Sequence, residues 1–171
     1  MTPAALACFA VVLLAAPLAW AQAPARPTPA RPAASGEMVT EANLSRDVLK
    51  AALDAAKMTT AVDASGNLTV SFALIRVHVL PGKDVVRLLV SFSFAPRAAM
   101  QEKLDLANRI NDQYIVLRAA VPAERPDQLS VDHYIVLGPG VSRAAIAAAT
   151  RRFADVVVEA IGAVDTDNLL K

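Results

Sequence analysis

The chain has very few cysteine, tryptophan and histidine residues, which limits the chemistry that it can perform. Its 171 residues include one cysteine, one tryptophan and two histidines. Cys8 and Trp20 lie in an N-terminal segment that we expect to be removed, which would leave the mature chain without a thiol. Such a chain forms no internal disulfide and has no thiol nucleophile, and two histidines do not complete a zinc site without carboxylates at ligand spacing. The sequence therefore predicts no metal and no cofactor.

The chain also lacks a strong net charge and the motifs of common enzymes. Its 17 Lys and Arg residues and 16 Asp and Glu residues give a formal net charge of +1, so we expect no electrostatic capture of nucleic acid. It contains no GxSxG elbow, no HExxH motif and no P-loop lysine. Asp132 and His133 are adjacent, but neighbouring side chains of a strand point to opposite faces and cannot form a dyad. We predict no catalytic residues and a non-enzymatic protein.

The longest hydrophobic run is too short to cross a membrane. It spans residues 6–18, whereas a membrane-spanning helix needs about 20 apolar residues. Ala19-Trp20-Ala21 then offers a small-x-small cleavage site, so residues 1–21 are predicted to be a signal peptide, although a positively charged n-region is missing. Residues 22–38, rich in Pro, Ala and Arg, are predicted to be a linker. We therefore expect a periplasmic or secreted protein with no stable membrane span after cleavage.

Residues 39–162 carry the hydrophobic periodicity of one folded domain. Thr40 is a candidate cap for the first helix, and the alternation of the second strand slips after Ile75, which we attribute to a β-bulge. Gly162 suits the C-cap of the last helix, and residues 163–171 are predicted to be a flexible tail. In order, we expect a helix at 40–57, strands at 58–63, 68–79 and 86–94, a helix at 96–111, strands at 115–121 and 129–137, and a helix at 142–161.

Four short motifs in this domain resemble those of the YbjN-like domain family. They are Asn108–Asn111, Leu129–Asp132, Gly140–Ser142 and Phe153 on the apolar face of the last helix. The resemblance implies an α+β fold in which helices pack an antiparallel sheet of about five strands in the order α-β-β-β-α-β-β-α, similar to type III secretion chaperones. It also implies a bacterial sensory transduction regulator that acts through protein contacts, as a chaperone-like module.

The second face of such a sheet is the predicted binding surface. Apolar residues with outward parity on the strands, and two asparagines at the end of the middle helix, form the candidate partner-binding set: Leu89, Val116, Tyr134, Val136, Asn108 and Asn111. The partner would be another protein or a second copy of the chain in a homodimer. The asparagines also have a structural interpretation, as helix caps or as hydrogen-bond partners of loop backbone, and His133 likewise as a core or edge histidine.

An alternative site lies at the start of the last helix. Gly138, Gly140 and Ser142 precede that helix, where backbone amides can hold an anion or a small molecule. The structural interpretation is that Ser142 is simply the N-cap of the helix. A periplasmic binding protein for a small molecule or an anion is therefore the second functional hypothesis.

Overall fold

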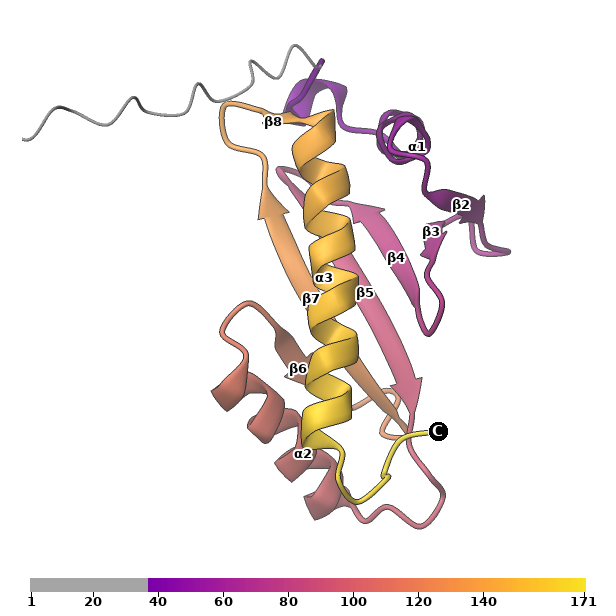
Figure 1. Ribbon diagram of the computed structural model, residues 1–171, viewed down its shortest axis with the longest axis vertical. Helices are drawn as coiled ribbons and strands as arrows, with labels where there is room; N and C mark the ends of the chain where they lie inside the picture. The colour runs from indigo at the N-terminus through magenta and orange to yellow at the C-terminus, as the bar shows by residue number, and fades with distance from the viewer. Residues whose placement is uncertain (1–36) are drawn as a thin grey trace, which may run out of the picture. The chain divides into compact units, whose positions relative to one another are not determined.

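The computed structural model describes residues 37–171, so the predicted signal peptide, nearly all of the predicted linker, and Cys8 lie outside the described residues (Figure 1). The helices are α1 (Arg46–Ala55), α2 (Met100–Gln113) and α3 (Arg143–Val164), with a short 3-10 helix η1 (Glu41–Asn43). The strands are β1 (Met38–Val39), β2 (Thr59–Val62), β3 (Leu68–Ser71), β4 (Arg76–Pro81), β5 (Val85–Ser93), β6 (Arg118–Ala120), β7 (Gln128–Val136) and β8 (Val141–Ser142).

The main sheet is antiparallel and has six strands in the order β2-β3-β4-β5-β7-β6. Its longest pairing joins β5 to β7, from Val85 opposite Val136 to Ser93 opposite Gln128. β1 and β8 form a separate two-stranded sheet at the start of α3. The predicted α+β class, with helices packed against an antiparallel sheet, is confirmed.

The core lies between one face of this sheet and the three α-helices. Leu88 and Val131 in the sheet, Leu49 on α1 and Leu106 on α2 are completely buried, and Phe153 on α3 is nearly so. Figure 1 shows α3 running along the front of the sheet, with α2 near one end of it and α1 near the other. Each large apolar side chain buried in this way contributes about 1.5–3 kcal/mol relative to an exposed one, so the helices are held mainly by this shared face.

The strand predicted over 68–79 is wrong, because the chain reverses in the middle of it. The Phe72 amide donates a hydrogen bond to the Ile75 carbonyl at 2.9 Å, and this closes a tight turn between β3 and β4. Leu68 therefore lies opposite Val79, and both side chains are buried. The shift in alternation after Ile75 marks this turn, not a bulge, and the sheet has one more strand than the expected five.

The first two helices begin later than predicted. Thr40 precedes η1, and α1 starts at Arg46 after its own cap, where Ser45 Oγ accepts a hydrogen bond from the Val48 amide at 3.2 Å. Before α2, the Glu102 carboxylate accepts a hydrogen bond from the Ala99 amide at 2.7 Å, so this helix starts at Met100 and not at residue 96. The start of α1 thus follows a side chain that caps a free amide of the first turn, whereas at α2 a side chain of the first turn reaches back to the amide of the N-cap residue.

The C-terminal segment is docked, and the predicted flexible tail at 163–171 is wrong. α3 continues through Gly162 to Val164, and the Asp165 carboxylate accepts hydrogen bonds from the amides of Leu169 and Leu170 at 2.8 and 3.1 Å. The Leu169 side chain is buried, and its carbonyl accepts a hydrogen bond from the Ala95 amide at 2.7 Å. The segment thus adds a short pairing beyond the end of β5.

Candidate functional site

The residues predicted to form one binding face do not share one surface. Leu89, Tyr134 and Val136 have the strand parity of the face turned away from the helices, whereas Val116 is not on a strand at all. β6 begins only at Arg118, because residues 115–117 form a turn in which the Leu117 amide donates to the Tyr114 carbonyl at 2.9 Å. The strand predicted at 115–121 is therefore shorter, and Val116 faces the helix side of the sheet.

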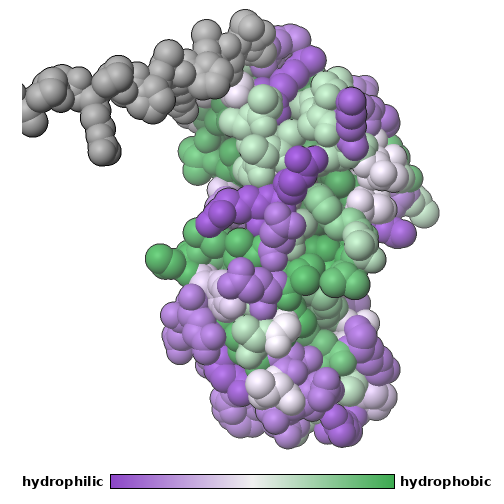
Figure 2. Space-filling model, viewed as in Figure 1, coloured by the Kyte–Doolittle hydropathy of each residue, from purple (hydrophilic) through white to green (hydrophobic). Residues whose placement is uncertain are grey.

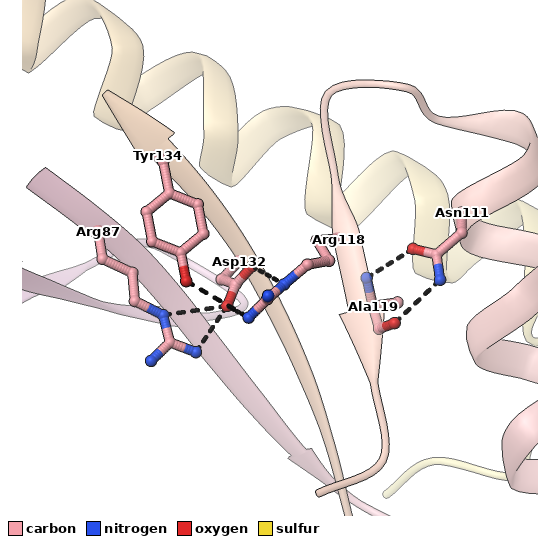
Figure 3. Close-up of polar contacts among 6 residues, drawn as sticks. All are labelled: Arg87, Asn111, Arg118, Ala119, Asp132 and Tyr134. Carbon is pink, nitrogen blue, oxygen red and sulfur yellow. Dashed lines mark hydrogen bonds and ion pairs between the residues drawn. The ribbon is translucent and has the colours of Figure 1, made fainter. Parts of the chain in front are cut away.

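A polar cluster centred on Asp132 occupies the face of the sheet that is turned away from the helices, which we call the open face (Figure 3). Asp132 is only 2% exposed although it is charged. Arg87 on β5 donates from Nε and Nη2 to Oδ2 at 3.0 and 2.6 Å. Arg118 on β6 donates from Nε to Oδ1 at 2.9 Å and from Nη2 to Oδ2 at 2.8 Å. One carboxylate therefore ties together three neighbouring strands.

Tyr134 completes this cluster from the same face of β7. The guanidinium carbons of Arg87 and Arg118 lie 5.9 and 5.6 Å from the centre of its ring, within the range of a cation–π interaction. The hydrogen bonds and the charge of Asp132 raise the pKa of Arg118 above its usual value. Leu89 lies opposite Asp132 on the neighbouring strand and is half-buried. This part of the open face is thus a satisfied polar cluster and not an apolar docking surface.

Asn111 closes the outer edge of the sheet at β6. Its side-chain oxygen accepts a hydrogen bond from the Ala119 amide at 2.7 Å, and its Nδ2 donates to the Ala119 carbonyl at 3.0 Å (Figure 3). The side chain therefore pairs with β6 as a further strand would; this is a structural role, but the partner is strand backbone and not the loop backbone or helix cap that was expected. Asn108 is exposed beside Glu102 and Asp105 and lies apart from the other candidate residues, at a different hollow.

The outer edge of β7 is only partly paired. β6 pairs with Ser130, Val131 and Asp132, and Figure 1 shows no strand of the described part beyond the other half of β7. Large apolar side chains are exposed beside this unpaired stretch: Ile115 at 96%, Val116 at 48%, Tyr134 at 39% and Val136 at 67%. We call residues 133–136 the free edge of β7. Ile115 is the most exposed of the four and was missed by the sequence reasoning.

An apolar hollow of about 100 Å³ lies next to the free edge of β7, on the helix side. Its walls include Val116, Leu117, His133, Phe153 and Val156, with the exposed Arg152 among the residues that line it. Figure 2 shows hydrophobic surface on both sides of a hydrophilic patch on the side of the molecule that α3 covers. The hollow brings together Val116 from the predicted set and residues of α3 that were not predicted.

His133 is part of the wall of this hollow. Its ring stacks on Phe153 with the centres 6.3 Å apart, and Nδ1 lies 2.9 Å from the Val116 carbonyl oxygen. The hydrogen-bond partner is thus a backbone carbonyl, and Asp132 projects to the opposite face. This confirms the interpretation of His133 as a hydrogen-bonded edge histidine.

The Gly138–Ser142 segment is occupied by contacts within the chain. Gly140 has φ +130°, and a Cβ there would lie 3.2 Å from the side chains of Met38 and Thr40. Ser142 Oγ accepts a hydrogen bond from the Ala145 amide at 3.2 Å, and β8 pairs with β1. Ser142 is therefore the N-cap of α3, as its structural interpretation predicted, and the geometry adds no support to the anion-binding alternative.

Residues 37–171 contain neither a cluster of metal ligands nor a helix that could span a membrane. Within this range no three His, Cys, Asp or Glu side chains are grouped closely enough to hold a metal ion. Across the same residues, none of the helices has the length and hydrophobicity needed to span a membrane.

Comparison with known proteins assigns the family. No curated protein matches the chain. Among solved structures, the chain is similar to YbjN from E. coli, described as "a putative transcription regulator". The TM-score is 0.64 and the sequence identity 16%, and the match covers 79% of this chain and 99% of the YbjN chain. It also matches the Yersinia pestis type III secretion chaperone SycH, in complex with a fragment of YscM2, with a TM-score of 0.44 and 13% identity over 66% and 97% of the two chains. The model of the YbjN family, "Putative bacterial sensory transduction regulator", matches residues 45–166. Because this match spans more than half of the chain, the protein belongs to the YbjN family.

Proposed function

We propose that this protein is a non-enzymatic, chaperone-like regulatory module of the bacterial envelope that binds another protein chain. The family description supports a regulatory role and names no catalytic activity. The N-terminal hydrophobic run followed by Ala19-Trp20-Ala21 supports export to the periplasm or beyond the cell. The partner is a different protein or a second copy of the same chain.

One observation carries the binding part of the proposal. Ile115, Val116, Tyr134 and Val136 are large, exposed and apolar, and they gather at the free edge of β7. Exposed apolar groups that cluster on a soluble domain mark sites of interaction, and unpaired strand backbone supplies hydrogen bonds that an added strand can use. Binding is therefore expected at the edge of the sheet, because the predicted face around Leu89 is occupied by the Asp132 cluster.

The test is to express the full chain in a bacterium, purify it from the periplasmic fraction and measure its mass and oligomeric state. Mass spectrometry should find a chain that begins at Gln22. Light scattering after size exclusion at several concentrations, with cross-linking in the envelope fraction, should detect a dimer or a reproducible protein partner. Val136→Asp should abolish this association, because it places a charge at the free edge of β7.

A matched control separates binding from folding. Val62 is 45% exposed on β2, at the opposite edge of the sheet, so Val62→Asp makes the same change where we expect no partner. Both variants should keep the wild-type circular dichroism spectrum. A protein that is monomeric at every concentration and cross-links to no partner would contradict the proposed function.

A further inference from the structure

We infer that the free edge of β7 takes an extended segment of a different protein, with a bulky aliphatic side chain in the adjoining hollow and a carboxylate two residues away against Arg152. This inference rests on the proposed function and specifies the partner. Three features of the edge lead to it: its unpaired backbone, the size of the hollow and the sign of the nearby charges.

The unpaired backbone selects an extended segment. Strand β6 stops opposite Asp132, so within the described chain residues 133–136 pair with only one strand, β5, although the turn that holds Val116 lies beside His133. A segment in β conformation can pair with this edge and place alternate side chains on the two faces of the sheet. On the helix side, the position beside His133 opens into the hollow lined by Val116, Phe153 and Val156.

The size of the hollow limits which side chain enters. Its volume is about 100 Å³, and apolar residues form most of its wall. For comparison, a dry protein cavity of roughly 150 Å³ holds a benzene molecule. The hollow therefore suits one aliphatic side chain such as leucine or isoleucine.

The charges beside the edge favour an acidic segment. Arg152 is exposed at the hollow, and the structure gives it no ion-pair partner among residues 37–171. On the other face, Arg118 is 62% exposed and shares the single carboxylate of Asp132 with Arg87. Because side chains two residues apart lie on the same face of a strand, a carboxylate two positions from the aliphatic residue meets Arg152.

The same charges disfavour the two occupants that the chain itself could supply. A second copy paired at the same edge would bring a second Arg118 and a second Arg152 into the interface, and it would offer no free-edge carboxylate to either, because residues 133–136 are His, Tyr, Ile and Val. The other occupant from the chain itself would be residues 22–36. This segment contains Pro24, Pro27, Pro29 and Pro32, and proline lacks the N–H group that pairs with a strand. Its only charged side chains are arginines, so it carries no carboxylate for Arg152. An acidic segment from another protein satisfies both the backbone and the charges.

The experiment is a selection from a random-peptide phage library on the purified full-chain product. We expect an enriched pattern of a branched aliphatic residue with Asp or Glu two positions away. Val116→Glu and Arg152→Glu should each weaken binding of the selected peptide by roughly tenfold or more, the size of effect expected for residues at the centre of an interface. The controls are Leu74→Glu, in the exposed turn on the other side of α3, and Arg151→Glu, the neighbouring exposed arginine, and both should stay within about twofold.

N-methylation of the selected peptide tests whether it pairs as a strand. Methyl groups on the amides that point toward β7 should abolish binding, whereas methyl groups on the alternate amides should leave it unchanged. Equal effects of the two sets, or a selected pattern without an aliphatic and an acidic residue, would overturn the inference.

The possible failures are distinguishable. If selected peptides bind but ignore both Val116→Glu and Arg152→Glu, the chain binds proteins elsewhere, and the proposed function stands without this inference. If the chain is a dimer that Val116→Glu dissociates, the free edge of β7 belongs to a second copy, which also overturns the inference. If no peptide is enriched and no partner or dimer is found, both fail.

Discussion

Replacement of Asp132 by Asn tests whether the buried carboxylate holds the open face of the sheet together. The substitution keeps the shape of the side chain but removes the charge that four hydrogen bonds from Arg87 and Arg118 share. Breaking a fully buried ion pair costs about 3–5 kcal/mol, whereas a surface pair contributes about 0–1 kcal/mol. Asp132 is 2% exposed, but the side chains of Arg87 and Arg118 are 34% and 62% exposed, so the pair lies between these limits.

We therefore expect Asp132→Asn to lower the free energy of unfolding by about 2 kcal/mol and the melting temperature by roughly 6–10 °C. Urea denaturation followed by circular dichroism measures the first quantity, and calorimetry the second. The matched control is Asp155→Asn on the exposed face of α3, which should change stability by no more than about 0.5 kcal/mol.

The two arginines should contribute unequally. Arg87→Met should destabilise the protein more than Arg118→Met, because Arg118 is more exposed and water screens its interaction. A double-mutant cycle with Asp132→Asn isolates each pairwise term. The reasoning would be refuted by a value for Asp132→Asn within about 0.5 kcal/mol of wild type, since the buried carboxylate would then not hold the three strands.

Three further predictions follow from single contacts. Asn111→Ala should cost about 1 kcal/mol and speed hydrogen exchange at the Ala119 amide, measured by NMR, because the outer edge of β6 loses its partner. The pKa of Asp63 is lowered below its usual value, mainly because its carboxylate accepts a hydrogen bond from the Asn67 amide. Its stabilisation is thus present above about pH 4 and lost as pH falls through the lowered pKa, so the stability difference between wild type and Asp63→Asn should be larger at pH 7 than at pH 3. Leu169→Ala should cost about 2–3 kcal/mol in chemical denaturation because this side chain is buried, whereas an untethered tail would show no change.

The central part of the fold was predictable because local patterns report it directly. β5 alternates buried and partly exposed residues along almost its whole length, and the sequence showed this alternation from Val86 to Phe94. The same parity argument placed Asp132 and His133 on opposite faces. His133 and Asn111 were each assigned a structural role from residue type and position, and the contacts of both agree with it.

The failures have identifiable physical causes. The turn at 72–75 is Phe-Ala-Leu-Ile, which contains none of the Gly, Pro, Asn or Asp residues by which turns are recognised. The cluster of Arg87, Arg118 and Asp132 depends on which strands are neighbours, and this order is not readable from the spacing of the residues in the chain. The hollow beside β7 likewise forms only where the turn at 115–117 packs next to α3, and the sequence does not show that these two segments are neighbours.

The strand edges next to the proposed site are covered, whereas the free edge of β7 is not. Asn111 pairs with the outer edge of β6, and the C-terminal segment covers backbone beyond the end of β5. Strand edges are commonly guarded by charge, proline or a covering segment, because unpaired backbone recruits other strands. The free edge of β7 instead carries His133, Tyr134, Ile135 and Val136, without a lysine or a proline, and it adjoins an apolar hollow. A sheet that closes its neighbouring edges but exposes hydrophobic side chains at this one is best explained by an added strand, which is why the binding experiments target β7 and not the open face.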